Sequence, residues 1–429
     1  MPDAPKPPLS LLRSFRHRNY RLFFSGQLVS LLGTWMQSVA QSWLVYQMTH
    51  SAVLLGVTGF VGQIPGFFVA PFGGIVADRH HRHRIVVVTQ ACAMLLALLL
   101  AALTLAHVVQ VWHILVLAGL LGVVTAFDVP ARQSLIADIV GHEDRANAIA
   151  LNSSMVTGSR IVGPAIGGVL VALVGEGWCF LFNGLSYIAV IAGLLAMQLP
   201  PHTRARPTAS PLEHMREGFR FAAQTLPVRS LLLLLGLVSL TGMPYAVLMP
   251  LFAQEILHGN SGTMGLLMSM AGAGALLASL TLAMRRELSG LGRWIALSAV
   301  VFGASLIAFA ASRHVWLSAV LLVPVGFAMQ IQMAGTNTLL QAMVPNALRG
   351  RLMSVFVMMF LGMSPFGALL AGTLAKAIGA PQTVALGGAA CLVGAALFWR
   401  QLPALRLAAR EVLAARTAEI RAAQRDAEP

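Results

Sequence analysis

Long apolar runs constrain the fold of this sequence more than any other feature. Residues 85–106, 178–199, 294–311 and 383–399 reach or approach the roughly 20 residues that an α-helix needs to cross a bilayer. Leu, Ala and Met fill these runs without the alternation of a transmembrane β-barrel, so we expect helices. The chain is 57% hydrophobic and 10% charged, which excludes a soluble globule. The sequence therefore predicts an all-α membrane protein.

The hydropathy pattern predicts twelve spans in two sets of six. They are residues 20–47, 52–77, 85–106, 110–132, 147–173, 178–199, 230–257, 261–284, 293–312, 315–343, 350–375 and 381–402. We divide the chain into a cytoplasmic leader, a first half, a linker, a second half and a tail, at 1–18, 19–199, 200–229, 230–402 and 403–429. The linker is expected to contain an amphipathic helix, and the tail a further helix at or near the membrane surface.

Basic residues lie mainly on one side of these spans. The net charge is +14, and Lys and Arg gather at one face within residues 6–21, 79–84, 132–145, 204–229, 285–293, 349–351 and 400–425. Arg313 and Lys376 fall at the other face. This is the positive-inside asymmetry of a membrane protein, not a nucleic-acid surface. We expect both termini in the cytoplasm, lipid as a partner and no nucleic acid.

Other chemistries find little support. Cys92, Cys179 and Cys391 show no paired spacing, and the His-rich turn at 80–83 lies among arginines without carboxylate or cysteine ligands, so we expect no metal. The sequence has no P-loop and no nucleophile with an orienting base. We therefore expect neither an enzyme nor a cofactor, with a proton gradient as the candidate energy source.

An internal repeat supports the division into halves. Three residues recur 204 positions later: Arg145 as Arg349, Gly163 as Gly367 and Gly168 as Gly372. Parallel six-helix repeats of this kind place a binding site at their interface near the middle of the membrane.

Polar side chains predict which spans line that interface. The third, sixth, ninth and twelfth spans carry few polar side chains, as lipid-facing helices should. The first, second, fifth and tenth spans carry Gln37, Gln41, Gln63, Asn152, Arg160, Gln330, Gln332 and Asn337. We expect these residues to line a wet substrate cavity. For any single amide, a hydrogen bond that joins two helices remains the alternative.

Arg160 is the most informative of these residues. A buried cation at mid-membrane is costly unless it is paired or hydrated. Its planar fork of donors suits a substrate carboxylate or catecholate. A structural contact with a helix C-terminus or nearby carbonyl groups is the alternative. Twenty Met residues also suit a deformable wall for varied apolar ligands.

The charged turn GGIVADRHHRHR, residues 73–84, must lie at a membrane face. One interpretation is a topogenic loop that its arginines hold in the cytoplasm. The other is a gate latch, in which Asp78 contacts a neighbouring helix end and the arginines meet carboxylates on adjacent spans.

With GSRIVGPAIGG in the fifth span and DVPARQSLIADIV closing the fourth, this turn makes the sequence resemble the major facilitator superfamily. The branch that it resembles most holds the enterobactin exporter and the macrolide efflux pumps, and the likeness covers nearly the whole chain. The resemblance implies twelve transmembrane helices in two pseudo-symmetric halves around a central path. It also implies a bacterial inner (plasma) membrane location, a small molecule as a partner, and a monomer.

The resemblance also implies roles for several residues. The residues that match its gate motif are Gly73, Asp78, Arg79 and Arg84. Asp78 is expected to meet the start of the eleventh span, where Arg349 and Arg351 are the candidates. Asp128 is expected to pair with an arginine of the loop, and Arg132, one turn further along the same helix, is its local alternative.

The fifth span resembles the motif of exporters. Its small residues and proline suit close helix packing and a bend, as a hinge or seal: Gly158, Gly163, Pro164, Gly167 and Gly168. Ordinary helix packing is the alternative. The arginine that drug/proton antiporters carry early in the fourth span is missing here, which leaves Asp128 and Glu255 as the acids near the spans for proton coupling.

These observations predict a secondary transporter that exports a moderately hydrophobic organic molecule, of the drug or siderophore class, by alternating access. Import of a nutrient by the same fold is the alternative.

Overall fold

The protein is described here from a computed structural model, which covers residues 12–141, 143–198, 211–285, 290–345 and 348–425. Within these residues the structure contains helices and no strand. The helices of the first part are η1 (Arg13–Arg16), α1 (Arg18–Thr49), α2 (Ala52–Arg79), α3 (Arg82–Leu105), α4 (Val111–Ile139), α5 (Arg145–Val174), α6 (Glu176–Leu195) and α7 (Pro211–Gln224). Those of the second part are α8 (Leu226–Leu237), η2 (Val238–Gly242), η3 (Met243–Leu248), α9 (Met249–Leu251), η4 (Phe252–Ile256), α10 (Ser261–Met284), α11 (Leu291–Ala311), α12 (Val315–Met343), α13 (Arg349–Val357), η6 (Met358–Gly362), α14 (Met363–Ile378) and α15 (Ala380–Arg425).

Eleven helical segments of the described chain are long and apolar enough to cross a membrane. The long helix α1 is not among them, because polar side chains such as Gln27 and Gln37 lower its hydropathy. Both of these glutamines are buried, and α1 packs along α5 and α6. The protein is therefore a multi-pass membrane protein, and α1 belongs to the same bundle.

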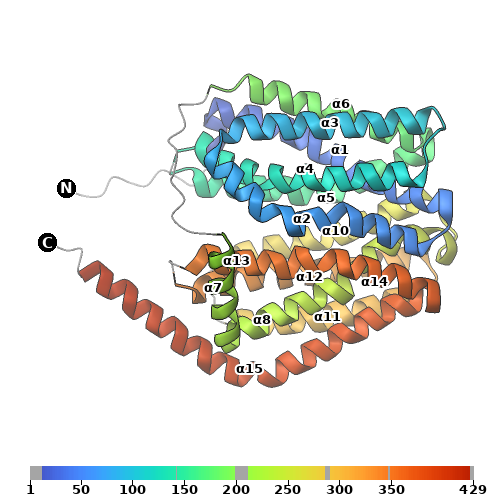
Figure 1. Ribbon diagram of the computed structural model, residues 1–429. Coiled ribbons are helices and arrows are strands. Elements are labelled where there is room, and N and C mark those ends of the chain that lie inside the picture. The colour runs from blue at the N-terminus through green and yellow to red at the C-terminus, as the bar shows by residue number, and fades with distance from the viewer. Residues whose placement is uncertain (1–11, 142, 199–210, 286–289, 346–347, 426–429) are drawn as a thin grey trace.

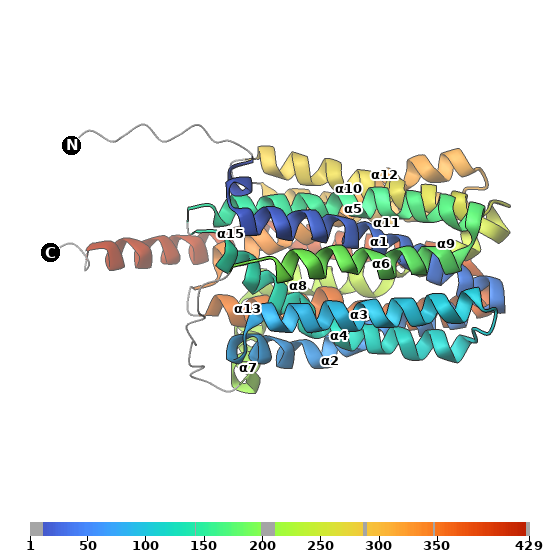
Figure 2. The same cartoon turned by 90° about the horizontal axis from the view of Figure 1, so that it is seen from above.

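The long helices run side by side (Figures 1 and 2), and in Figure 1 they form two groups. We call α1 to α6 the first helix set and α8 to α15 the second helix set. The main contacts between the sets are those of α5 with α10 and of α2 with α14. We call the end of the bundle where α1 begins the terminal end, and the end where α1 stops the opposite end.

The linker contributes one helix at the terminal end. Helix α7 lies across the axes of the long helices and packs on α13 (Figure 1). The contact is close, since a Cβ on Gly218 would lie 2.5 Å from the carbonyl oxygen of Arg351. Glu217 of α7 also forms an ion pair with Arg351.

The second helix set contains breaks that we did not predict. The span expected at 230–257 as one regular helix consists of α8, η2, η3, α9 and η4, which alternate between α, π and 3₁₀ geometry. Pro244 and Pro250 lie in this stretch, and each lacks the N–H that a regular helix needs. Such irregular turns inside transmembrane helices often mark functional sites. Helix α15 differs as well, because it continues without interruption from the last span into the tail and bends away from the bundle (Figure 1).

Candidate functional site

A cavity of about 90 Å³ lies between the two helix sets. Trp35 of α1 and Arg160 and Pro164 of α5 line it from the first set. The second set contributes residues of η3, α9, α10 and α12: Tyr245, Ala246, Met249, Met268, Ala271, Gly272, Ala275, Gly326, Met329 and Gln330. The cavity thus depends on both sets and on the irregular stretch η3.

Arg160 brings a positive charge into this apolar cavity. It lies near the middle of the 30-residue helix α5, and its guanidinium carbon is 5.3 Å from the centre of the Trp35 ring. Such stacking stabilises a cation by cation–π attraction. Gln330 adds an amide to the wall, and its Nε2 donates to Ser279 Oγ at 3.1 Å.

Pro164 shapes α5 beside the cavity. It has no N–H to donate to the carbonyl of Arg160, four residues earlier. Helix α10 comes very close to that carbonyl, since a Cβ on Gly272 would lie 2.8 Å from its oxygen. One turn further on, Ser269 Oγ donates to the carbonyl of Ile161 at 2.7 Å. Around Pro164, α5 is therefore packed against the second helix set.

Glycines join the two sets nearer the opposite end. A Cβ on Gly168 would lie 2.9 Å from the Cα of Gly265, so the backbones of α5 and α10 touch. Helices α2 and α14 make the equivalent contact, where a Cβ on Gly372 would lie 3.0 Å from the Cα of Gly56. Gly158, which lies nearer the terminal end of α5, makes no such contact, because a Cβ there would meet no described atom within 4 Å. We call the interface between the two helix sets the seam, and its backbone contacts are tight towards the opposite end.

Polar side chains bridge the same seam at the opposite end. Tyr46 of α1 donates a hydrogen bond to Glu255 of η4. Beside it, Gln47 Nε2 donates to Gln254 Oε1 at 2.7 Å. Glu255, which the sequence left as a candidate acid for proton coupling, is thus part of a contact between the sets.

The other residues expected in the cavity lie in several places. Gln37 is buried and accepts a hydrogen bond from Asn183 Nδ2 at 2.6 Å, within the first set. Gln332 is buried near Ser298 of α11, within the second set. For these two amides the contact joins neighbouring helices, although the Nε2 of Gln332 has no hydrogen-bond partner among the described residues.

Four further polar positions are also placed. Asn337 Oδ1 accepts from Gln341 Nε2 at 2.7 Å along α12. The Oδ1 of Asn152 is buried and has no hydrogen-bond partner among the described residues, Gln41 is half-buried, and Gln63 is exposed. None of the three is among the residues that line the 90 Å³ cavity.

The expected gate residues lie at the terminal end. Gly73 packs directly on α4, since a Cβ there would lie 2.3 Å from the carbonyl oxygen of Ala126. The side chains of Asp78 and Arg79 are outside the described part of the chain, while Arg84 is exposed at the start of α3. Arg349 and Arg351 begin α13, where Arg351 forms its ion pair with Glu217 of α7.

Asp128 is buried in the first helix set and pairs with its local alternative. Arg132 Nε lies 3.2 Å from Asp128 Oδ2, one turn along α4. Thr89 Oγ1 and Gln90 Nε2 of α3 donate to Oδ1 at 2.8 Å and 2.9 Å. These donors stabilise the buried carboxylate, which ties α3 to α4.

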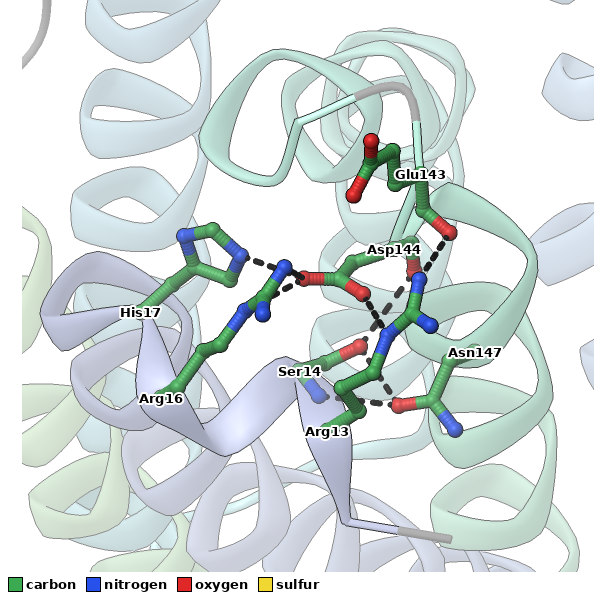
Figure 3. A network of polar contacts seen from close by, with 7 residues as sticks. All are labelled: Arg13, Ser14, Arg16, His17, Glu143, Asp144 and Asn147. Atoms are coloured by element: carbon green, nitrogen blue, oxygen red, sulfur yellow. Dashed lines mark hydrogen bonds and ion pairs between the residues drawn. The ribbon is translucent and has the colours of Figure 1, made fainter. Parts of the chain in front are cut away.

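Sequence reasoning missed a polar network around Asp144, which precedes α5 (Figure 3). Arg13 Nε donates to Oδ1, while Arg16 Nε and His17 Nε2 each lie 2.8 Å from Oδ2. Hydrogen bonds from His17, and then from Arg13 and Arg16, lower the pKa of the Asp144 carboxyl to about 2. The network fixes η1 to the start of α5. An acid just before a helix, in a chain with a basic leader, was the available signal.

The helical bundle and the cavity between its two sets define a polytopic membrane transporter. The chain belongs to the transmembrane secretion effector family of the major facilitator superfamily, which it matches over residues 9–422. This confirms the resemblance that the three sequence motifs predicted. The family and the fold are those of transporters, not of enzymes.

Relatives of known function support this classification. The chain is 27% identical to the staphyloferrin A transporter of Staphylococcus aureus, over 86% of this chain and 92% of that protein. It is 27% identical to the multidrug efflux pump Tap of Mycolicibacterium fortuitum, over 88% and 95%. The enterobactin exporter EntS of Citrobacter koseri is 26% identical over 85% and 87%.

Solved structures show the same fold. An inward-facing, occupied bacterial homologue of the human lysosomal transporter Spinster superposes with a TM-score of 0.71. It covers 92% of this chain and 97% of that one, at 15% identity.

Proposed function

We propose that this protein is a secondary active exporter of a small organic molecule, of the siderophore or drug class. It works by alternating access, with the first and second helix sets as pseudo-symmetric halves that rock about the cavity. The observation that carries this proposal is the seam itself. Glycine contacts and hydrogen bonds close it at the opposite end, and a cavity lined by both sets begins at mid-depth.

Twelve spans complete this scheme. We take α1 as the twelfth, because its polar side chains are matched within the bundle: Gln37 with Asn183. The terminal end then faces the cytoplasm, which agrees with the excess of basic residues there. In this orientation the closed seam is on the outside, so the cavity is reached from the cytoplasm.

Export is the direction that the relatives favour. The Tap and EntS proteins are named as an efflux pump and an exporter, and both are similar to this chain over more than four fifths of its length. A proton gradient is the energy source that we propose, since the sequence contains no P-loop for ATP.

The charged turn at 73–84 acts as the inner latch in this proposal. Its Asp78 and the arginines that begin α13 come from different halves, so a contact between them would hold the terminal end closed. Asp78→Asn is therefore expected to abolish transport while leaving the amount of protein in the membrane unchanged. Normal transport by that variant would reject the latch.

Transport by whole cells tests the function. Cells that express the protein are loaded with dyes, macrolides, catecholates or hydroxycarboxylates, and the loss of each compound is followed with and without a protonophore. Faster loss than from vector-only cells, abolished by the protonophore, is expected for at least one compound. Accumulation in place of loss would mean import, and equal behaviour of both cell types across the panel would reject the proposal.

A further inference from the structure

We propose that the substrate is an organic anion, whose carboxylate or catecholate oxygens bind the guanidinium of Arg160. This inference rests on the proposed transport function and names the chemical class that the cavity takes. Arg160, Trp35, Tyr245 and Gln330 form the binding site, and they come from both helix sets.

Arg160 has no acidic partner among the described residues. The ion pairs of the described residues lie elsewhere, around Asp144, Asp138, Asp128 and Glu217, and none includes Arg160. Arg160 lies halfway along a transmembrane helix, where an isolated cation is costly unless water or an anion accompanies it. A protein that keeps such a charge at the wall of a cavity gains most from a ligand of opposite sign.

Arg160 contacts an aromatic ring, that of Trp35. Its guanidinium lies 5.3 Å from the centre of the Trp35 ring. A cation–π contact of this kind uses no N–H group as a hydrogen-bond donor. The N–H groups of Arg160 form the planar fork that binds a carboxylate or two adjacent oxygens in a bidentate manner. Trp35 therefore orients Arg160 without using the donors that a ligand needs.

The rest of the wall contributes polar groups without charge. Gln330 uses its Nε2 on Ser279, which leaves its carbonyl oxygen as an acceptor for a ligand hydroxyl. Tyr245 contributes a phenol that can donate or accept. One cation, one amide oxygen and one phenol suit a hydroxycarboxylate or a catechol, both of which combine anionic oxygens with hydroxyl groups.

The volume of the cavity is small. The cavity of about 90 Å³ holds a few water molecules, so a whole ligand must displace part of the wall. The second helix set lines it with Met249, Met268 and Met329, whose unbranched side chains adapt to irregular shapes. Gly272 and Gly326 leave the backbone itself exposed at two points. The wall can therefore open without moving a rigid aromatic side chain.

Binding by the purified, full-length protein tests this inference. The probes are citrate and 2,3-dihydroxybenzoate as anions, trimethyl citrate as a neutral counterpart, and ethidium as a cation, measured by equilibrium dialysis. Arg160→Gln is expected to weaken anion binding at least about tenfold and not to weaken ethidium binding. The anion affinity of Arg160→Lys is expected to lie between those of the wild type and Arg160→Gln, because lysine keeps the charge and lacks the planar fork of N–H donors. Lys376→Gln, which removes an exposed charge from α14, is the matched control and should bind like the wild type.

The two anions also distinguish a hydroxycarboxylate site from a catecholate site. Equal anion binding by the wild type and Arg160→Gln would overturn the inference, as would binding of trimethyl citrate as tight as that of citrate. Binding and efflux of ethidium alone would overturn it too, while leaving the proposed export function intact. Absence of transport for every compound in the cell assay would instead remove the export function on which it rests.

Discussion

The glycine contact between α5 and α10 gives the sharpest test of the closed seam. Gly168→Ala places a Cβ 2.6 Å from the carbonyl oxygen of Ser261 and 2.9 Å from the Cα of Gly265. Ordinary contacts begin at 3.4 Å, so the two helices must separate by about 0.8 Å, the difference between 3.4 Å and 2.6 Å. The hydrogen bond from Ser261 Oγ to the carbonyl of Gly168, now 3.0 Å, lengthens with them.

The energy of this change follows from packing. Overfilling a tight contact costs about 1–3 kcal/mol, and the blocking atoms at Gly168 are backbone, which cannot rotate away. Because the strain exists only while the seam is closed, it shifts the closed–open equilibrium towards the open form by about 5- to 150-fold. Gly158→Ala is the matched control: it makes the same change in the same helix, and its Cβ would meet no described atom within 4 Å.

Spin labels on Met48 and Ile378, which are exposed near the ends of α1 and α14, measure the opening. In a background without native cysteines, Gly168→Ala is expected to add a population at longer distance, and Gly158→Ala to match the parent protein. An unchanged distance distribution in Gly168→Ala would refute the argument that this contact holds the seam closed. So would an equal shift in both variants, because that would trace the effect to helix propensity.

Three further changes have defined outcomes. Tyr46→Phe removes the hydrogen bond to Glu255, which contributes about 1 kcal/mol. The longer-distance population of the spin labels should therefore rise up to about fivefold. No rise would mean that this bond does not hold the seam closed. Asp144→Asn should lower the melting temperature at pH 7. Since the folded pKa of Asp144 is depressed, the difference from wild type is present above about pH 4 and closes as the pH falls towards 2; a difference independent of pH would contradict this. Asp128→Asn leaves Arg132 without its carboxylate and should cost about 1–3 kcal/mol of unfolding free energy; an unchanged denaturation midpoint would be inconsistent with that ion pair.

Helix positions follow from the sequence where turns are short and polar. The spans expected at 261–284 and 315–343 coincide with α10 and α12. At α10 the reason is local, because Asn260 caps the helix by accepting from the N–H of Thr263. The broken stretch from α8 to η4 was not predicted, although Pro244 and Pro250 were visible. Hydropathy measures burial in lipid and does not register a change from α to π geometry.

The candidate site could be predicted in part. Arg160 was identified because the cost of a charge at mid-membrane depends on one residue and its depth. Trp35 and Tyr245 were not, because an aromatic ring fits lipid, a helix interface or a cavity equally well until its neighbours are known. The Asp144 network joins residues about 130 positions apart, and only the folded chain brings them together.

The repeat explains why one charge in this cavity suits transport. The offset of 204 residues that relates Gly163 to Gly367 aligns Arg160 with Ser364 in the sequence. The second helix set therefore has no arginine at the equivalent position. The second set contributes polar groups without charge, such as Tyr245 and Gln330. In the proposed alternating-access mechanism, the distance between the cation and these groups would change as the sets move, and the affinity for an anion would change with it. A ligand drives alternating access only if its affinity differs between the two states. An arginine in each half would oppose this difference, because it would hold the anion from both sides.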